Sequence, residues 1–341
     1  HKMGIHGSPT CTMEYDGAKG WLVGEEFKGM AGMFIMMNSA RLNVGVQGVG
    51  IAERAYQQAL AYAKDRRQGK AIKGEGPGPH AIIDHPDVRR TLAVMKARIE
   101  AARAICYHAA VEADLGAFGD DADEKAWSKR REDLLIPIAK AWSTDMGVEV
   151  ASMGVQVHGG MGFVEETGAA QHYRDARIAP IYEGTNGIQA IDLVGRKLVR
   201  DGGQAMNELI EDVRQTVEDC ATSSNPELPG LADRLKPACD ALEEASAWLL
   251  KASDEDRLAA ATPFLKLAGD VAGGWLLCVG AVAAQRMLKE GSNEAGYAHA
   301  RISLARVYAE TVLSSAPGLV GDVKVGAEPL FGPGEAMLES A

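Results

Sequence analysis

Three long stretches in the first part of the chain keep apolar side chains at the spacing of an α-helix, and this periodicity restricts the fold more than any other feature. The stretches 30–66 and 124–157 each carry an apolar residue every few positions, over about ten helical turns. The stretch 86–117 has Pro86 in its first turn, where proline suits a helix start. A shorter helix is expected at 186–200. Long helices with short connections predict an antiparallel four-helix bundle.

The second half of the chain continues the helical pattern. Further amphipathic helices are expected at 203–222, 230–252, 256–290 and 294–315. The segment ATSSNPELPG separates the first two of them, and the tail from residue 317 is rich in Gly and Pro, so it is expected to be extended. We interpret residues 29–200 as the bundle domain and residues 201–341 as an additional helical domain with an irregular tail.

The first 28 residues follow a different pattern. Residues 10–15 contain strand-forming side chains, Asp16 and Gly17 are a turn signal, and residues 21–23 form a second short apolar run. Two strands cannot bury a face by themselves. We therefore interpret residues 1–28 as the remnant of a β-domain and the chain as a fragment. The expected fold class is all-α, with a four-helix bundle, an additional helical domain and this short β remnant.

Charge and cysteine content argue against several kinds of partner. The formal net charge is −11, so a nucleic-acid partner is not expected, because a basic surface is needed to neutralise phosphates. The 5 cysteines are scattered and never form a C-x-x-C pair, which argues against a zinc site or a disulfide framework and favours a reducing, cytoplasmic location. No metal site is expected, and no apolar run is expected to reach the length of a membrane span.

The segment APIYEGTNGIQAIDLVGRKL (179–198) places a single carboxylate, that of Glu183, in a glycine-flanked loop before a helix. A base that removes a proton from carbon needs a carboxylate in a dry pocket on a rigid support. Pro180 and a helix start capped by Thr185 would provide the support, and Gly184 would let a ligand approach the backbone. The more common explanation of such a local pattern is a surface acid stabilised by the helix dipole.

Three other segments carry candidate binding residues. In GVQVHGGMGF (154–163), adjacent glycines after a helix either offer N–H groups to an anion or form a tight corner, and His158 either binds a ligand or is structural. In AYAKDRRQGK (61–70), cations at a helix end either stabilise its C-terminus or clamp a phosphate. Arg41 lies in the weakly polar run MFIMMNSARLNVGVQGVG, which implies a carboxylate partner or a functional role.

Taken together, these segments resemble a known family. NSARLNVGVQGVGIAERAYQQALAYAKDRRQG, QVHGGMGF and RDARIAPIYEGTNGIQAIDLVGRKL, in this order and spacing, are similar to the C-terminal half of the acyl-CoA dehydrogenases. The resemblance covers about residues 1–200. Residues 203–316 look like the extra helical domain of a subset of these enzymes, which includes ones that act on methylmercaptopropionyl-CoA.

The resemblance implies a role for each matching residue. Glu183 matches the base that takes the α-proton of an acyl-CoA while a hydride leaves the β-carbon for FAD, which yields a trans-2-enoyl-CoA. Some family members place the base just before the matching arginine, where this chain has Ala40. The positions that would contact the substrate are Asn38, Arg41 and Gly184. Those that would contact FAD, some of them across a subunit boundary, are Arg66, Gln68, Gln156, Val157, His158, Gly159, Gly160, Thr185, Asn186 and Gly187.

The same resemblance implies the partners. They are an acyl-CoA substrate, an electron-transferring flavoprotein as electron acceptor, and further copies of the chain in a homodimer or a dimer of dimers. Two alternatives stay open on the sequence alone. An acyl-CoA oxidase would let dioxygen reach the reduced flavin and would produce peroxide. As an isolated fragment, the chain would be an inactive helical module that only oligomerises.

Overall fold

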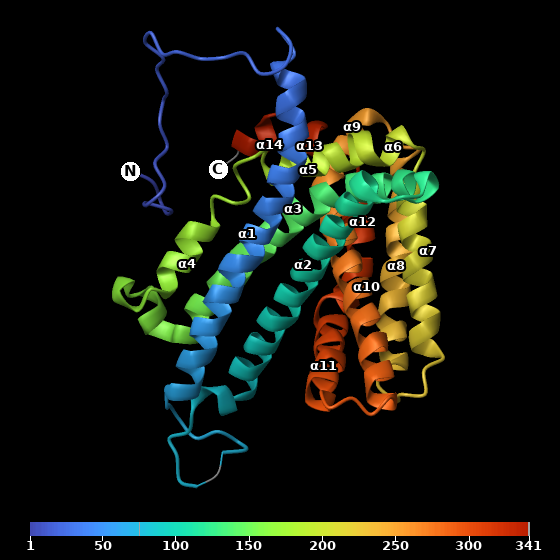
Figure 1. Cartoon of the computed structure of the whole chain (residues 1–341). Helices are drawn as coiled ribbons and strands as arrows, with labels where there is room; N and C mark the ends of the chain where they lie inside the picture. Colours follow the sequence, from blue (N-terminus) through green and yellow to red (C-terminus); the bar gives the residue numbers. More distant parts are fainter. Residues whose placement is uncertain (75, 340–341) are drawn as a thin grey trace.

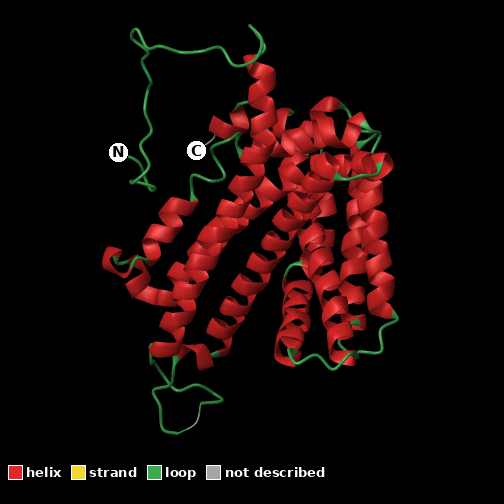
Figure 2. Ribbon diagram, in the orientation of Figure 1, coloured by secondary structure: helices red, strands yellow, loops and turns green. Residues whose placement is uncertain are grey.

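The structure is a computed structural model that describes residues 1–74 and 76–339 (Figures 1 and 2). The described residues form helices, turns and loops, with no β-strand and one isolated antiparallel bridge between Arg67 and Ala81. The all-α prediction is confirmed. Two groups of helices, one from each half of the chain, lie side by side in Figure 1.

Three long helices form the frame of the first group: α1 (Gly29–Asp65), α2 (Pro86–Phe118) and α3 (Ala122–His158). Their bounds lie within two residues of those expected from the periodicity. Consecutive helices run antiparallel, so α1 and α3 run parallel to each other (Figure 1). α3 begins where the Asp121 carboxylate accepts hydrogen bonds from the N–H groups of Asp123 and Glu124 at 3.0 and 2.8 Å.

The fourth helical segment runs without a break over residues 186–200, as expected, but it contains a π turn. After the short α4 (Ala169–Ala176) and a loop, the chain forms α5 (Asn186–Asp192), the π-helical turn η4 (Leu193–Lys197) and α6 (Leu198–Arg200). These pieces pack at one end of the bundle, with α5 against α3 (Figure 1). The sequence predicts one helix at 186–200, and the π turn inside it is not visible in the periodicity. Such turns are frequent at functional sites.

Glycines allow α1 and α3 to approach each other closely. A β-carbon added at Gly45 would lie 2.6 Å from the carbonyl oxygen of Ala139, and one added at Gly48 would lie 2.5 Å from that of Ser143. Both distances are well inside van der Waals contact, so only glycine fits at these two positions. The contact therefore decides where the middle of α3, with the side chains that it carries, stands relative to α1.

The second half of the chain forms α7 (Gln204–Ala221), α8 (Pro229–Leu249), α9 (Asp254–Ala259), α10 (Ala261–Lys289) and α11 (Ala295–Thr311). α10 packs against α2 and α3, and buried residues of both halves belong to one hydrophobic core. Trp142 Nε1 on α3 donates to Asp270 Oδ1 on α10 at 2.9 Å, and Arg131 pairs with Asp212 on α7 at 2.8 Å. The two expected domains therefore share one core.

α10 corrects one expectation from the sequence. Among the described residues it is the single helix that is long and apolar enough to cross a membrane by composition. Its apolar stretch is 72% buried, chiefly among α2, α3, α8 and α11. A helix that is apolar on all sides also occurs in the core of a large helical protein. The packing therefore makes α10 a core helix.

Three further expectations are wrong. The strands expected at 10–15 and 21–23 do not form, because residues 6–30 are exposed throughout and no described strand pairs with them. The helix expected at 256–290 divides into α9 and α10 at Ala260. The tail is helical rather than extended, because its side chains at Ala316 and Val323 are buried, and it forms η5 (Leu313–Gly318), α12 (Leu319–Lys324), α13 (Glu328–Phe331) and α14 (Ala336–Glu339).

Candidate active site

Glu183 lies in the loop between α4 and α5 with its backbone in the left-handed region. Its φ is 58°, and the φ of Gly184 is 81°. Glycine adopts this conformation freely, whereas a glutamate there costs on the order of 1–3 kcal/mol and persists where its surroundings hold it. The side chain is half-buried, and its carboxylate has no hydrogen bond or ion pair within residues 1–74 and 76–339. Strain of this kind is concentrated at functional sites.

Contacts on both sides of Glu183 hold the loop. The Tyr182 hydroxyl donates a hydrogen bond to the side-chain oxygen of Gln47 on α1. The N–H of Asn186 donates to the carbonyl of Pro180 at 2.9 Å, which closes the loop on itself. Thr185 caps α5 through its hydroxyl oxygen, as the sequence predicts. The turn is thus fastened to α1 and to the start of α5.

Two backbone donors in the turn are left over. The N–H groups of Glu183 and Gly184 donate no hydrogen bond within the described part of the chain. A β-carbon at Gly184 would lie 3.0 Å from the amide nitrogen of the Gln189 side chain, and φ at this position is positive, so glycine is required here. The loop therefore presents an unpaired carboxylate and two free N–H groups together, which suits a ligand with a carbonyl and an acidic C–H.

Lys140 makes a contact with this loop that sequence reasoning missed. It stands on α3 with no exposed surface, and its Nζ donates to the carbonyl oxygen of Gly184 and to Oδ1 of Asn186, both at 2.8 Å. The signal in the sequence is one lysine inside the apolar run LLIPIAKAW (134–142). A buried ammonium needs partners, but the sequence does not say which.

The side chain of Asn186, predicted to contact the cofactor, is committed to α3. Its Nδ2 donates to the carbonyl of Ala141 and to the hydroxyl of Thr144, both at 3.0 Å, and to the carboxylate of Asp145 at 2.7 Å. With Lys140 on its Oδ1, the amide makes all of its bonds within the protein. Asn186 therefore holds the loop on α3 instead of offering its side chain to a ligand.

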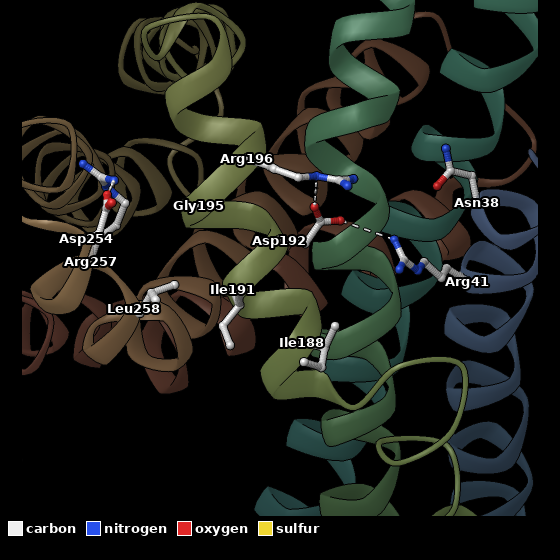
Figure 3. A pocket seen from close by; sticks show the side chains of 10 residues that line it. All are labelled: Asn38, Arg41, Ile188, Ile191, Asp192, Gly195, Arg196, Asp254, Arg257 and Leu258. Atoms are coloured by element: carbon white, nitrogen blue, oxygen red, sulfur yellow. Dashed lines mark hydrogen bonds and ion pairs between the residues drawn. The ribbon is translucent and has the colours of Figure 1, made fainter. Parts of the chain in front are cut away.

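Asn38 and Arg41 line a pocket of about 640 Å³ beside α5. Figure 3 shows its walls, which come from α1, from α5 with the π turn, and from α9 in the second half of the chain. Arg41 Nη1 lies 3.3 Å from Asp192, which also pairs with Arg196 at 2.7 Å. Arg41 therefore has the carboxylate partner that its sequence context implied, and it also lines a cavity. The pocket also has apolar side chains, which the sequence did not single out: Ile188, Ile191 and Leu258.

The structure brings Arg41, Lys140 and Glu183 together. Burial is the main cause of the lowered pKa of Lys140, and the charges of Arg41 and Glu183 act on that pKa in opposite directions. Lys140 bonds to the carbonyl of Gly184, next to Glu183, and Arg41 pairs with Asp192 at the end of α5. The pocket on one side of α5 and the turn before it form one site, built from α1, α3 and α5.

The predicted residues of the segments 61–70 and 154–163 lie at the opposite end of α1 and α3. His158 is buried, and its ring stacks on that of Tyr62 with the centroids 4.4 Å apart. Its Nδ1 bonds to the carbonyl of Gly154 at 2.7 Å, so the imidazole serves the structure. Val157 is buried as well, whereas Gln156 is exposed.

Exposed groups at this end suit an anion. Gly159 and Gly160 are exposed, and nothing lies within 4 Å of a β-carbon placed at either. Arg66 and Gln68 are exposed just beyond the end of α1, and the Arg66 guanidinium has no ion pair with any described residue. The N–H of Gly159 donates to the carbonyl of Gln156, so the unpaired donor at this end is the Arg66 guanidinium, a group that suits phosphate. No cluster of metal-binding side chains occurs in the part of the chain that the structure describes.

The two clusters are far apart. Gln47, which accepts the hydrogen bond of Tyr182 beside Glu183, and Arg66 are separated by 19 positions along α1, which corresponds to about 28 Å. One chain therefore does not bring Glu183 and Arg66 to the same part of a ligand. The distance fits the expectation that the second cluster serves a neighbouring subunit, which stays a prediction.

Lys140 leads to a prediction about pH. Burial lowers its pKa from 10.5 to about 8, against the opposing charge of Asp145. Between these two pH values the unfolded chain binds more protons than the folded chain, so raising the pH stabilises the fold. We expect the free energy of unfolding to rise by up to about 3 kcal/mol relative to that of Lys140→Met over this range. Denaturant titrations of both proteins at about pH 8, 9 and 10 measure the difference, and a constant difference would contradict it.

Two models of known protein families match the chain, one in each half. The family described as "Acyl-CoA dehydrogenase, C-terminal domain" matches residues 28–198, which contain Arg41, Lys140 and Glu183. The family described as "Acetyl-CoA dehydrogenase C-terminal like" matches residues 209–332. The boundary between the two matches lies close to the domain boundary expected at residue 200.

Individual relatives cover nearly the whole chain. A 3-methylmercaptopropionyl-CoA dehydrogenase of Ruegeria pomeroyi is 46% identical over 316 residues, 92% of this chain and 53% of the relative. A butyryl-CoA dehydrogenase of Syntrophomonas wolfei is 31% identical over 92% of this chain and 53% of its own length. The chain spans about half the length of these curated relatives.

A solved structure shares the fold of both halves. ACDH-11 of Caenorhabditis elegans, in complex with C11-CoA, superposes with a TM-score of 0.68 at 22% identity, over 93% of this chain and 49% of that chain. Likeness at this identity shows the fold alone. The sequence match over residues 28–198, on this helical fold, shows that the chain belongs to the acyl-CoA dehydrogenase family.

Proposed function

We propose that the chain forms the C-terminal part of an FAD-dependent acyl-CoA dehydrogenase, in which Glu183 removes the α-proton of the thioester. The observation that carries the proposal is the state of Glu183, an unpaired carboxylate on a strained turn that α1 and α3 hold in place. A proton leaves the α-carbon and a hydride leaves the β-carbon, so the product is a trans-2-enoyl-CoA.

The backbone of the same turn assists the proton transfer. Removal of the α-proton places negative charge on the thioester oxygen. The free N–H of Glu183 is a donor that can stabilise this charge, and it stands on the same residue as the base. Because the turn is held rigidly, the donor and the carboxylate keep one relative position while the charge develops.

The exposed groups at both ends of the bundle fit FAD. The Arg66 guanidinium supplies a donor for its diphosphate, the open corner of Gly159 and Gly160 leaves room for it, and Thr185 and Gly187 are exposed beside the base. FAD, when bound, would accept the hydride that leaves the β-carbon. Because the two sets of residues lie about 28 Å apart along α1, we propose that each cofactor contacts two subunits of a homodimer.

The pocket beside α5 is the proposed place for part of the acyl-CoA. It combines Asn38, the Arg41 guanidinium and an apolar patch. These suit, respectively, the amide groups, the negative charge and the methyl groups of coenzyme A. The name of the Ruegeria pomeroyi relative suggests short or methylthio-substituted acyl groups as the first substrates to test. We propose a cytoplasmic enzyme that passes its electrons to an electron-transferring flavoprotein.

The test uses the whole protein loaded with FAD. Mixing it without oxygen with a panel of saturated acyl-CoA thioesters, 3-methylmercaptopropionyl-CoA included, is expected to bleach the flavin absorbance and to release the matching enoyl-CoA. No bleaching by any saturated acyl-CoA would contradict the proposal. In air, rapid peroxide release would indicate an oxidase, whereas reduction of an electron-transferring flavoprotein would indicate a dehydrogenase.

A further inference from the structure

Lys140 is buried in a way that packing alone does not explain. Its side chain has no exposed surface, and its Nζ reaches two neutral oxygens at 2.8 Å, the carbonyl of Gly184 and Oδ1 of Asn186. Lysines are almost never fully buried without a partner charge. Here no carboxylate of the described chain lies within ion-pair distance of the ammonium. Burying this ammonium without a paired carboxylate costs free energy, which suggests that Lys140 has a specific role.

Both acceptors of Lys140 belong to the turn that carries Glu183. The carbonyl of Gly184 belongs to the second of the two left-handed residues, so its direction depends on the backbone conformation of the strained turn. Asn186 begins α5 and fastens the other end of the turn to α3. The second donor to the Gly184 carbonyl, Gln189 Nε2, lies farther away at 3.4 Å. Lys140 therefore makes the shorter bond to this carbonyl.

We infer that Lys140 is a positioning residue for Glu183: from α3 it holds the Gly184 carbonyl and the Asn186 amide, and thereby keeps the left-handed turn that aims the base. The inference rests on the proposed function, in which Glu183 is the base. The support is rigid because the glycine contact places α3 on α1, with Gly48 against the carbonyl of Ser143. Loss of the ammonium would free the Gly184 peptide to rotate and would relieve the strain at Glu183.

The first measurement follows the loop itself. Lys140→Met keeps most of the apolar stem and removes the donor. The control is Lys197→Met, because Lys197 is also nearly buried, with 13% exposure, and pairs with Asp133 at 3.0 Å instead of with the loop. In the 341-residue chain, hydrogen–deuterium exchange of amides 181–189 is expected to be about 10-fold faster in Lys140→Met and unchanged in Lys197→Met.

The second measurement follows the reaction of the whole protein with FAD bound. We expect Lys140→Met to slow flavin reduction by an acyl-CoA about 100-fold, while the dissociation constant of the acyl-CoA changes less than about 3-fold. A base in the wrong position raises the energy of the transition state more than that of the bound substrate, so the rate falls while the dissociation constant changes little. A general loss of structure would change both. Lys197→Met is expected to react at the rate of the wild type.

Several outcomes would overturn the inference. One is a hydrogen–deuterium exchange rate of the loop amides in Lys140→Met equal to that of the wild type. Another is an increase of this rate in Lys197→Met as large as in Lys140→Met. If Lys140→Met does not fold, Lys140→Gln, whose side chain is one bond shorter, replaces it with the same expected result. A Glu183→Gln variant separates the two ideas. If it loses activity while Lys140→Met reacts at the wild-type rate, the inference fails and the proposed function stands; if Glu183→Gln stays active, both fail.

Discussion

Replacing Glu183 by glutamine is expected to slow the reduction of the flavin by an acyl-CoA by about 10³-fold, within the range that a general base contributes. Glutamine has the size and shape of glutamate but cannot accept the α-proton. The contacts that hold the turn come from Tyr182, Lys140 and Asn186, so the turn is expected to stay in place. Stopped-flow absorbance of the whole protein with FAD measures the rate.

An exposed acid outside the turn provides the control for Glu183→Gln. Glu165 lies on the preceding segment, is 69% exposed and pairs with Arg174 at 2.7 Å, so Glu165→Gln is expected to react at the wild-type rate. Melting temperatures close to that of the wild type would show that both variants are folded. Flavin reduction at the wild-type rate in Glu183→Gln would remove this residue from the reaction.

Replacing Gly48 by alanine is expected to lower the free energy of unfolding by about 3 kcal/mol, at the upper end of what overpacking costs. The new methyl group would lie 2.5 Å from the carbonyl oxygen of Ser143 and 2.9 Å from the Cα of Thr144. Both are backbone atoms, so no side-chain rotation relieves the overlap and α3 must move away from α1. Denaturant titration followed by circular dichroism measures the loss.

The same helix contains its own control. Gly50 is two positions along α1, and nothing lies within 4 Å of a β-carbon placed there. Gly50→Ala is therefore expected to raise the free energy of unfolding by about 0.5–1 kcal/mol, because alanine loses less conformational freedom in a helix. Equal stability of Gly48→Ala and Gly50→Ala would show that the contact between α1 and α3 is looser than described.

The helices in the first half of the chain could be predicted closely because the apolar residues that pack each helix on the core lie within that helix. The apolar stripes along α1, α2 and α3 repeat at the helical period, and the cap at Thr185 and the first-turn proline Pro86 mark helix starts by local chemistry. The same local rules failed where the outcome depended on distant partners. Residues 10–15 have strand-forming side chains but no described strand to pair with, and the Gly-rich tail becomes helical because Val323 is buried.

The candidate base was visible in the sequence, whereas its supports were not. Glu183 stands out as a lone acid between Tyr182 and Gly184, just before a helix cap. Lys140 is 43 positions earlier, and nothing in the run LLIPIAKAW shows that its ammonium meets the Gly184 carbonyl. Likewise, the apolar surroundings of Arg41 in the sequence indicated that it needs a carboxylate partner, but that partner, Asp192, is 151 positions away. A sequence pattern shows that a buried charge needs a partner, and only the packing of helices selects one.

By itself, the sequence determined the helical class, the long helices of the first half and the position of the acid, because periodicity, caps and glycine-flanked loops act over a few residues. The tertiary structure decided the rest: the left-handed turn at Glu183, its attachment to α3, and the wide separation of Glu183 from Arg66. These depend on how closely α1 and α3 pack. That distance results from glycines on one helix meeting backbone atoms of another, which no local pattern records.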